Sequence, residues 1–429
     1  MNDMYGSSRK FVFCSPISPM TTGTAVYFEK ILRRILSTGL VDVRDLVILT
    51  DSKLIDGVLP KTYLNVEVRD YKSWPHVVAN NETWFLFLAN NEFHAFAHEI
   101  IDDVRNINAG KVISIVHEPS NYMLIRHLSY NRMSGYNPER LVQGMVCQFG
   151  EKSRRLLHDA DQGLTDNIFN HVVLAQSGLY NKSDEIWTHS RYAAAVLQVE
   201  YIGKLQNLPF KIFSHPKDDL KRYSQSGTAP REKFRIGIFG WISLAKRVRE
   251  VLVGLRLALD RLDHASRLDI ELIVVGKLPS DPNYNVINMA EFLHLKENVR
   301  FLGYQPDEEF EQLLATCSIV YNLRFPSCGE TSGTINLAQG AGAKIVKTAY
   351  QAMHEEPAHE EITFLPFLES FAVASSICKN YENWKLGLWD VSFRSNADDE
   401  LESAPIELGI LEEILNGTRN ISSVEKLSS

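Results

Sequence analysis

The sequence predicts an α/β protein with two parallel sheets, one in each half of the chain. Short runs rich in β-branched and aromatic residues alternate with segments of helical periodicity, and a polar segment rich in Ser, Pro and Gly divides this alternation in two. A chain of 429 residues, of which 45% are hydrophobic and 23% are charged, is long enough for two packed domains.

The first half opens with a strand at Phe11–Cys14, a loop of Ser, Pro, Thr and Gly, and a helix from about Ala25. Further strands are expected within Leu46–Thr50, Thr83–Ala89, Lys111–Pro119 and Glu185–Thr188, and Ser190 can cap the helix after the last of them. The stretch from about 120 to 170 has helical patterns and no obvious strand, with Pro138 at a first helical position. We expect a helical insertion there.

The second half repeats the alternation. Its expected elements are strands at Phe234–Gly240, Glu271–Gly276, Val299–Tyr304 and Ser318–Leu323, and helices near 248–262, before Cys317 and from about Thr331. The last ~30 residues, after Asp398, suggest a helix and a frayed tail. The predicted organisation is a first domain over 1–214, a linker over 215–233, a second domain over 234–400, and a terminal helix and tail over 401–429.

Composition excludes several classes of function. The net charge of −8 disfavours nucleic acid as a partner. No apolar run reaches the ~20 residues of a membrane-spanning helix, and the first residues lack the apolar core of a secretory signal, so we expect a cytoplasmic protein. Five scattered cysteines without a C-x-x-C pair suggest neither disulfides nor a zinc site.

The strongest local signal is the stretch Pro326–Gly342, in which an acidic residue precedes small hydroxyl and glycine residues at an expected helix start. The backbone N–H groups of such a start bind anions, so we expect a phosphate near Thr331, Ser332, Gly333 and Thr334. Glu330 beside them could accept hydrogen bonds from sugar hydroxyls. The alternative is a helix-capping loop with a solvated glutamate.

A second signal is IGIFGWISLAKR, where Gly240 ends a strand and Lys246 and Arg247 follow one short loop later. Cations in this place can neutralise a diphosphate leaving group. Gly237 and Gly240 have the spacing G-x-x-G, whereas a dinucleotide loop needs G-x-G-x-x-G, so hydride chemistry with NAD is disfavoured. The alternative is a pair of solvated cations on a helix.

Together these stretches resemble the large retaining family called glycosyl transferases group 1. Gly240–Lys246 resembles its Gly-Arg-x4-Lys loop, ELIVVG the strand that follows, VRFLGYQPDEEF its FLG segment, and Glu330 the first glutamate of its Glu-x7-Glu motif. The resemblance implies the GT-B fold, an α/β architecture in which two Rossmann-like parallel-sheet domains face each other across a cleft.

The resemblance also implies roles for particular residues. Gly23, in the first loop, would let the backbone approach the donor, and His117, at a strand end, resembles the active-site histidine. The expected catalytic residues are therefore His117, Lys246 and Glu330. Donor-binding residues would be Gly23, Gly240, Arg247, Tyr304, Thr331, Ser332, Gly333 and Thr334.

The implied activity is transfer of a hexose, with retention, from a UDP- or GDP-linked donor to a glycan or lipid-linked glycan, as in bacterial polysaccharide or lipopolysaccharide synthesis. No metal or other cofactor is expected. The helix Ala25–Leu36 carries Lys30, Arg33 and Arg34, which could rest on the inner face of a membrane, although an ordinary amphipathic surface helix fits them as well.

The sequence departs from the family pattern in two places. Trp241 stands where the loop arginine is expected, and the second glutamate of Glu-x7-Glu falls near Leu337 or Ala338. These losses motivate an alternative, a non-catalytic partner subunit that acts as a scaffold for another glycosyltransferase. An epimerase on the same fold lacks a clear set of acid and base residues. The D-x-D pattern Asp159–Asp161 ends a helical stretch, where a solvated helix end is expected and not a metal site.

Overall fold

The computed structural model describes residues 11–55, 57–76, 82–106, 110–130, 137–166, 168–175, 180–200, 208–216, 233–279, 284–363, 368–388 and 404–425. The chain forms two compact units. The first comprises residues 1–216, 328–331 and 402–429, and the second comprises residues 217–327 and 332–401. Most of the expected linker, residues 217–232, lies outside the described residues.

The first unit is built on an eight-stranded sheet in the order β3-β4-β2-β1-β5-β6-β7-β8, parallel except for the β3–β4 pair. Its strands are β1 (Phe11–Cys14), β2 (Leu46–Thr50), β3 (Thr62–Tyr63), β4 (Val66–Asp70), β5 (Thr83–Leu88), β6 (Val112–Val116), β7 (Glu185–Thr188) and β8 (Phe210–Ile212). All residues of β1, β2 and β6 are buried, as expected for parallel strands covered on both faces.

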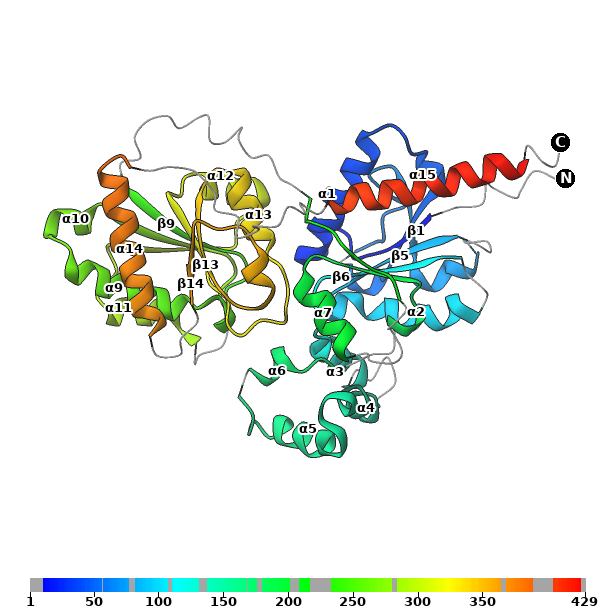
Figure 1. Cartoon of the computed structure of the whole chain (residues 1–429), viewed down its shortest axis with the longest axis horizontal. Coiled ribbons are helices and arrows are strands. Elements are labelled where there is room, and N and C mark those ends of the chain that lie inside the picture. The colour runs from blue at the N-terminus through cyan, green and yellow to red at the C-terminus, as the bar shows by residue number, and fades with distance from the viewer. Residues whose placement is uncertain are drawn as a thin grey trace. The chain divides into compact units, whose positions relative to one another are not determined.

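Helices cover this sheet. They include α1 (Gly23–Ser37), α2 (Ala95–Asn106) and α7 (Arg191–Glu200), and Ser190 Oγ accepts the N–H of Ala193 at 3.0 Å, which confirms it as the cap of α7 (Figure 1). The insertion after β6 is helical, as predicted, with α3 (Tyr122–Tyr130), α4 (Pro138–Phe149), α5 (Ser153–Asp161) and α6 (Phe169–Val172).

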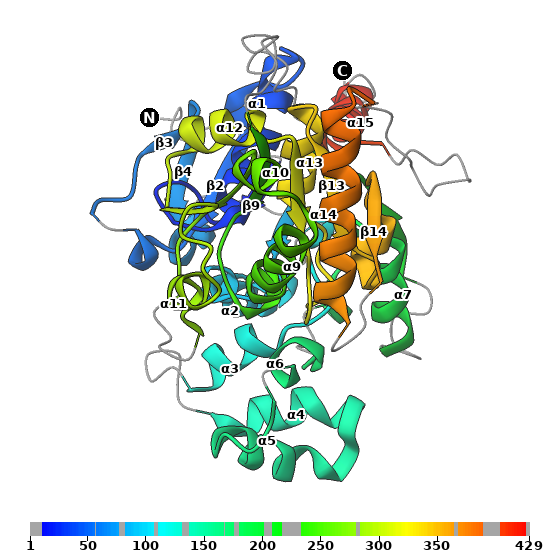
Figure 2. The same cartoon turned by 90° about the vertical axis from the view of Figure 1, so that its left-hand side faces the viewer.

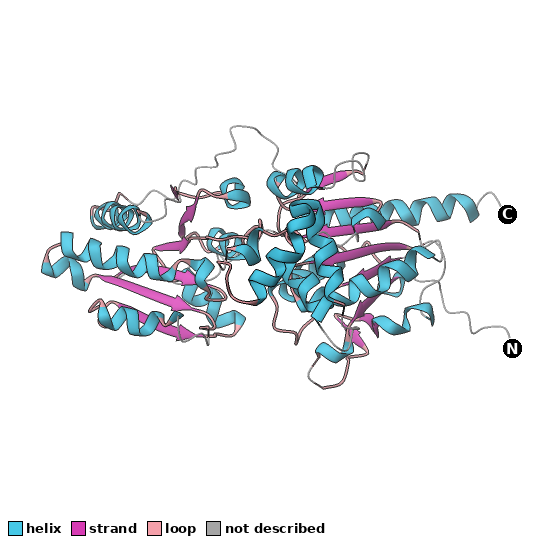
Figure 3. Cartoon of the chain, turned by 90° about the horizontal axis from the view of Figure 1, so that it is seen from below, coloured by secondary structure: helices cyan, strands magenta, loops and turns pink. Residues whose placement is uncertain are grey.

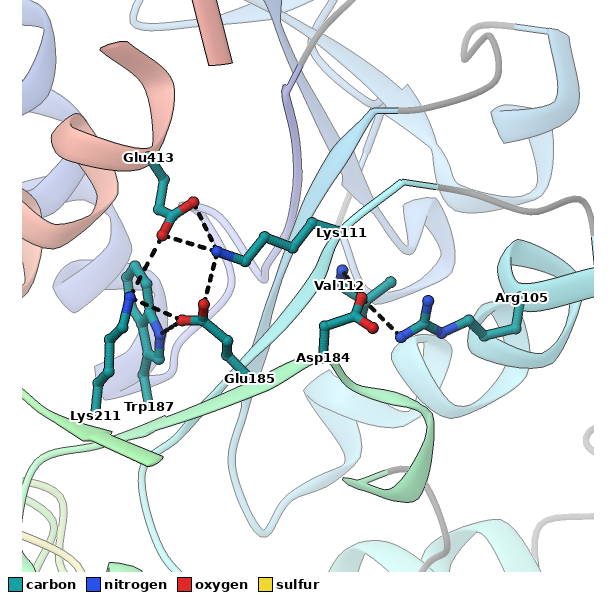
Figure 4. A network of polar contacts seen from close by, with 8 residues as sticks. All are labelled: Arg105, Lys111, Val112, Asp184, Glu185, Trp187, Lys211 and Glu413. Atoms are coloured by element: carbon teal, nitrogen blue, oxygen red, sulfur yellow. Dashed lines mark hydrogen bonds and ion pairs between the residues drawn. The ribbon is translucent and has the colours of Figure 1, made fainter. Parts of the chain in front are cut away.

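The C-terminal helix α15 (Ile406–Glu425) packs on the first unit. Four of its apolar side chains enter the core beside the side chains of α1 and β1, namely Ile406, Ile410, Leu411 and Ile414. Glu413 of α15 also lies 2.8 Å from Lys111 Nζ and 3.4 Å from Lys211 Nζ, and both lysines contact Glu185 (Figure 4). Burial acts to raise the pKa of Glu185, but hydrogen bonds from Lys111, Trp187 and Lys211 hold it below its ordinary value.

The second unit holds a fully parallel six-stranded sheet in the order β11-β10-β9-β12-β13-β14. Its strands are β9 (Phe234–Phe239), β10 (Ile270–Val275), β11 (Val299–Gly303), β12 (Ile319–Asn322), β13 (Lys344–Thr348) and β14 (Glu360–Ile362). The helices are α9 (Val248–Arg261), α10 (His264–Leu268), α11 (Val286–Phe292), α12 (Asp307–Ala315), α13 (Gly333–Gly340) and α14 (Glu369–Lys385). Figure 2 shows α9 and α14 side by side, and in Figure 3 the strands of this unit run between helices.

The expected strands and helices of both halves are present, with end positions shifted by a few residues. No pattern in the sequence predicted the strands β3, β4, β8, β13 and β14, or the helices α10, α11 and α14. These strands are short or carry charged residues, as in KIVKT of β13, where Lys344 and Lys347 are nevertheless buried. A lysine can occupy a buried strand when its ammonium group is paired, and Lys347 Nζ lies 2.8 Å from Glu361.

Candidate functional site

The carboxyl end of β9 positions the loop that carries Gly240 and Lys246. Gly240 has a φ of +100°, in the region that favours glycine. The loop continues into a short 3₁₀ turn, Leu244–Lys246, and turns back so that Lys246 is only 4% exposed. Its Nζ donates to Phe239 O at 2.9 Å and to Asn322 Oδ1 at 3.1 Å. A Cβ at Gly240 would lie 3.4 Å from Lys246 Nζ, so the missing side chain leaves room beside the ammonium group.

Asn322, the last residue of β12, links this lysine to the start of α13. Its side-chain amide donates to Ser332 Oγ at 3.0 Å, and Ser332 is the residue before the first turn of α13. Thr334 Oγ1 lies 3.5 Å from the Cβ position of Gly240, and a Cβ at Gly333 would meet nothing within 4 Å. The structure therefore brings together Gly240, Lys246, Ser332 and Thr334, with Gly333 beside open space, as an anion at a helix start requires.

Glu356 occupies part of this helix start. Its Oε1 accepts the N–H of Ser332 at 3.2 Å. Burial raises the pKa of Glu356 to about 7, against the lowering effects of that hydrogen bond and of Lys347. Glu356 was not among the predicted site residues, because it lies beyond β13 in the sequence and only the fold brings it to the start of α13.

Two predicted donor-binding residues lie apart from this group. Arg247 points to α14, where Nη2 lies 2.7 Å from Glu369, and it also lies 2.8 Å from Glu250. Tyr304 follows β11, the edge strand, two strands away from β9, and is 69% exposed. Arg247 therefore has ion-pair partners within its own unit. Tyr304 has an exposed ring just after the carboxyl end of β11.

His117 follows β6 directly in the first unit, as predicted, and is buried. Its ring stands edge-on to Tyr27 of α1, with centroids 4.5 Å apart. His117 Nε2 is buried without a hydrogen-bond partner among the described residues. Burial, reinforced by nearby histidines, holds the pKa of His117 well below its ordinary value, so the imidazole is neutral at pH 7.

Three further histidines lie near His117, and none of them was among the predicted site residues. The ring centroid of His189 lies 5.3 Å from that of His117 and 4.2 Å from that of His215, and Tyr27 Oη lies 2.7 Å from His189 Nε2. His94 Nε2 lies 2.9 Å from Thr24 Oγ1 at the start of α1. The available signal was their position, because they follow β5, β7 and β8, and these strands lie in one sheet with β6, which precedes His117.

Gly23 begins α1, and a Cβ there would meet nothing within 4 Å. The start of α1 therefore has open space beside its backbone, which suits the predicted approach of a ligand.

The short loop that carries Glu330 belongs to the first unit. Glu330 Oε2 accepts the N–H of Cys328 at 2.8 Å, and Thr331 Oγ1 lies 2.5 Å from His215 Nε2. Gly329 has a φ of +86°, and its Cβ would lie 2.8 Å from Pro119, so this turn requires glycine. Thr331 therefore contacts the histidine cluster of the first unit through His215.

The other charged patterns have structural partners. Asp161 ends α5 and accepts hydrogen bonds from Arg126 at 2.8 Å and Tyr130 at 2.9 Å. Arg34 of α1 pairs with Glu407 of α15 at 2.6 Å, and Arg33 pairs with Glu29. Within the described parts of the chain, no cluster of three or more His, Cys, Asp or Glu is arranged to hold a metal ion, and no helix could span a membrane.

Comparison with solved structures establishes the class of fold. Alr3699/HepE of Anabaena, in complex with UDP, has a TM-score of 0.53 at 14% identity over 97% of this chain and 99% of that chain. WaaG, a glycosyltransferase involved in lipopolysaccharide biosynthesis, has a TM-score of 0.54 at 14% identity over 94% and 99%. Sucrose-phosphate synthase from Thermosynechococcus elongatus has a TM-score of 0.57 at 10% identity over 98% and 100%. The chain has the GT-B fold.

One stretch of the sequence matches a family model. Residues 223–334, which include β9, the Lys246 loop and the start of α13, match the model of the family Glycosyl transferases group 1. The match covers 112 of the 429 residues. A search of curated proteins gives no match.

Proposed function

We propose that the protein transfers a sugar from a nucleoside-diphosphate sugar, and that the donor diphosphate binds in the second unit. The observation that carries the proposal is the convergence of Lys246, Thr334 and the open start of α13 beside Gly240. An ammonium group, a hydroxyl and helical N–H groups are the donors that a diphosphate needs. The matched family and the presence of UDP in the HepE structure support the same ligand class.

The proposed chemistry needs no nucleophile from the protein. The bond between the sugar C1 and the diphosphate oxygen breaks, an acceptor hydroxyl oxygen bonds to C1 on the same face, and the acceptor proton passes to the departing phosphate oxygen. The configuration at C1 is then retained. Negative charge grows on the leaving diphosphate, so Lys246 and the start of α13 would stabilise the transition state. No metal is required, because these groups supply the positive potential.

In the first unit, His117 and Glu330 would hold the transferring sugar. The neutral imidazole of His117 has a buried Nε2 without a hydrogen-bond partner among the described residues, which suits a sugar hydroxyl. We propose a hexose as the sugar and a glycan or lipid-linked glycan as the acceptor. The helical insertion α3–α6 is the part of the first unit where acceptor specificity would lie. The proposed location is the cytoplasm or the inner face of a membrane.

The experiment is a thermal-shift panel with UDP, GDP, ADP, CDP and NAD at millimolar concentration. Binding to the folded state raises the melting temperature by mass action. We expect one nucleoside diphosphate to stabilise the protein, and the variant Lys246→Met to lose that stabilisation. Lys296→Met is the matched control, because Lys296 is an exposed lysine of the same unit. A wild-type protein that no nucleoside diphosphate stabilises would contradict the proposal.

A non-catalytic partner subunit is the second candidate. Trp241 replaces the expected loop arginine, and Arg247 is already paired with Glu369 and Glu250. A scaffold would retain the fold and lack the donor site. The same panel separates the two candidates, since a scaffold would show no shift.

A further inference from the structure

The ends of β9 and β10 run side by side beyond the sheet. Gly240 N donates to Val275 O at 3.0 Å, and Ile242 N donates to Lys277 O at 3.1 Å. This approach depends on Gly276, which has a φ of +144° and whose Cβ would lie 1.8 Å from Gly240 O. The backbone of the two loops is therefore fixed in register, and residues 241 and 277 become neighbours.

The side chains at these two positions form a cation–aromatic pair. Lys277 Nζ lies 5.1 Å from the centroid of the Trp241 ring. Trp241 is 60% exposed although the next residue, Ile242, is fully buried. Lys277 is also exposed. An exposed indole that holds an ammonium group is a feature for which the packing of the unit gives no reason, since neither side chain contributes to its core.

The neighbouring cations at the ends of β9 and β10 differ from Lys277 in their partners. Lys246 is buried and donates to Phe239 O and Asn322 Oδ1, while Arg247 is paired with two carboxylates. At the ends of β9 and β10, among the described residues, Lys277 is the cation that is exposed and contacts an uncharged ring. A ring face attracts an ammonium group without neutralising it and restricts its rotamers, so the charge remains available to an anion.

We infer that Lys277, oriented by the Trp241 ring, binds the diphosphate group of the nucleotide donor. This inference rests on the proposed function, because it assigns a further cation to that donor site. The carboxyl ends of adjacent parallel strands are where such sheets bind ligands, and Trp241 directly follows Gly240, which lies beside Lys246 and Thr334. Trp241 is a positioning residue, and Lys277 supplies the charge.

The test is calorimetric titration with the nucleoside diphosphate that most stabilises the wild-type protein, and with its parent nucleoside. We expect Lys277→Gln to weaken diphosphate binding about tenfold, the loss of one charge-assisted contact, and to leave nucleoside binding unchanged. Lys277→Arg should restore most of the affinity, and Lys296→Gln is the control for an exposed lysine elsewhere in the unit. Lys277 is exposed, so these variants should retain the wild-type melting temperature.

The role of the ring is measured by a double-mutant cycle with Trp241→Leu. We expect Lys277→Gln to weaken diphosphate binding several-fold less in the Trp241→Leu background. A lysine that the ring no longer orients already contributes less to that affinity. Equal losses in both backgrounds would overturn the role of the ring. Wild-type affinity in Lys277→Gln, or an equal loss for nucleoside and diphosphate, would overturn the role of Lys277 while the proposed function stands. A wild-type protein that binds no nucleoside diphosphate would overturn both.

Discussion

A methyl group has no room at Gly276, where the ends of β9 and β10 meet. Its Cβ would overlap the carbonyl oxygen of Gly240, and its φ of +144° is one that other residues rarely adopt. We expect Gly276→Ala to lower the free energy of unfolding by roughly 3 kcal/mol or more, measured by urea denaturation.

Gly303 is the matched control for this substitution. It also has a positive φ, +69°, but a Cβ there meets nothing within 4 Å. Gly303→Ala should lower the free energy of unfolding by only about 1–2 kcal/mol, because only the backbone conformation is unfavourable for alanine there. Equal losses in the two variants would show that the close approach of the two loops is not required.

Glu356 makes the free energy of unfolding depend on pH, and the direction of its pKa shift fixes the sign of that dependence. Its pKa in the folded protein is raised to about 7, above the ordinary value of 4.5, so the folded chain keeps this proton to a higher pH than the unfolded chain. The stability from this group is therefore full below about pH 4.5 and is lost as the pH rises through 7. We expect Glu356→Gln to remove this decline, since the amide can still accept the N–H of Ser332.

The measurement is the free energy of unfolding between pH 5 and 8. Glu297→Gln, at an exposed position elsewhere in the same unit, should follow the wild-type curve. A Glu356→Gln variant with the same pH profile as wild type would contradict this account of Glu356.

At the scale of elements, α15 completes the core of the first unit. Ile410 is fully buried there, whereas Leu408, two residues earlier, is 52% exposed. We expect Ile410→Ala to cost about 2–5 kcal/mol, the usual range for a buried large-to-small change. Leu408→Ala should change stability by less than about 0.5 kcal/mol. Urea denaturation of the full chain measures both, and similar effects of the two substitutions would show that α15 does not pack as described.

The elements also show what a sequence can predict. The strands β1, β2, β5 and β6 contain no charged residue, so their apolar pattern alone predicts them. In contrast, β8 has three residues, and β13 contains two buried lysines, one of which is paired with Glu361. Such a strand is stable only because of partners distant in sequence, and a local pattern does not contain that information.

The residues of the candidate site likewise divide into those that the sequence predicted and those that only the fold brings together. Gly240, Lys246, Ser332 and Thr334 were predicted from two motifs, and the fold brings them together through Asn322. The three histidines whose rings contact Tyr27 are His117, His189 and His215, and they follow three different strands. Their proximity depends on strand order, which the sequence pattern does not give. The contacts of Glu356 and Lys277 likewise depend on tertiary structure. The roles assigned to all these residues remain predictions.

At the scale of the whole molecule, each unit has its own sheet and core, and the chain returns to the first unit at its end. The net charge of −8 contrasts with the positive groups at the candidate donor site, Lys246, Lys277 and the start of α13. If the proposed function is right, an anionic ligand binds through these local groups, against the charge of the molecule as a whole.

The measurement that tests the central claim most directly is release of nucleoside diphosphate from a panel of UDP- and GDP-sugars, in the presence of EDTA. With water as a slow acceptor, we expect the wild-type protein to release nucleoside diphosphate from one donor, and Lys246→Met to lower the rate about a hundredfold or more. The control Lys296→Met should match the wild type. No release from any sugar nucleotide, by a protein that binds the corresponding nucleoside diphosphate, would contradict sugar transfer.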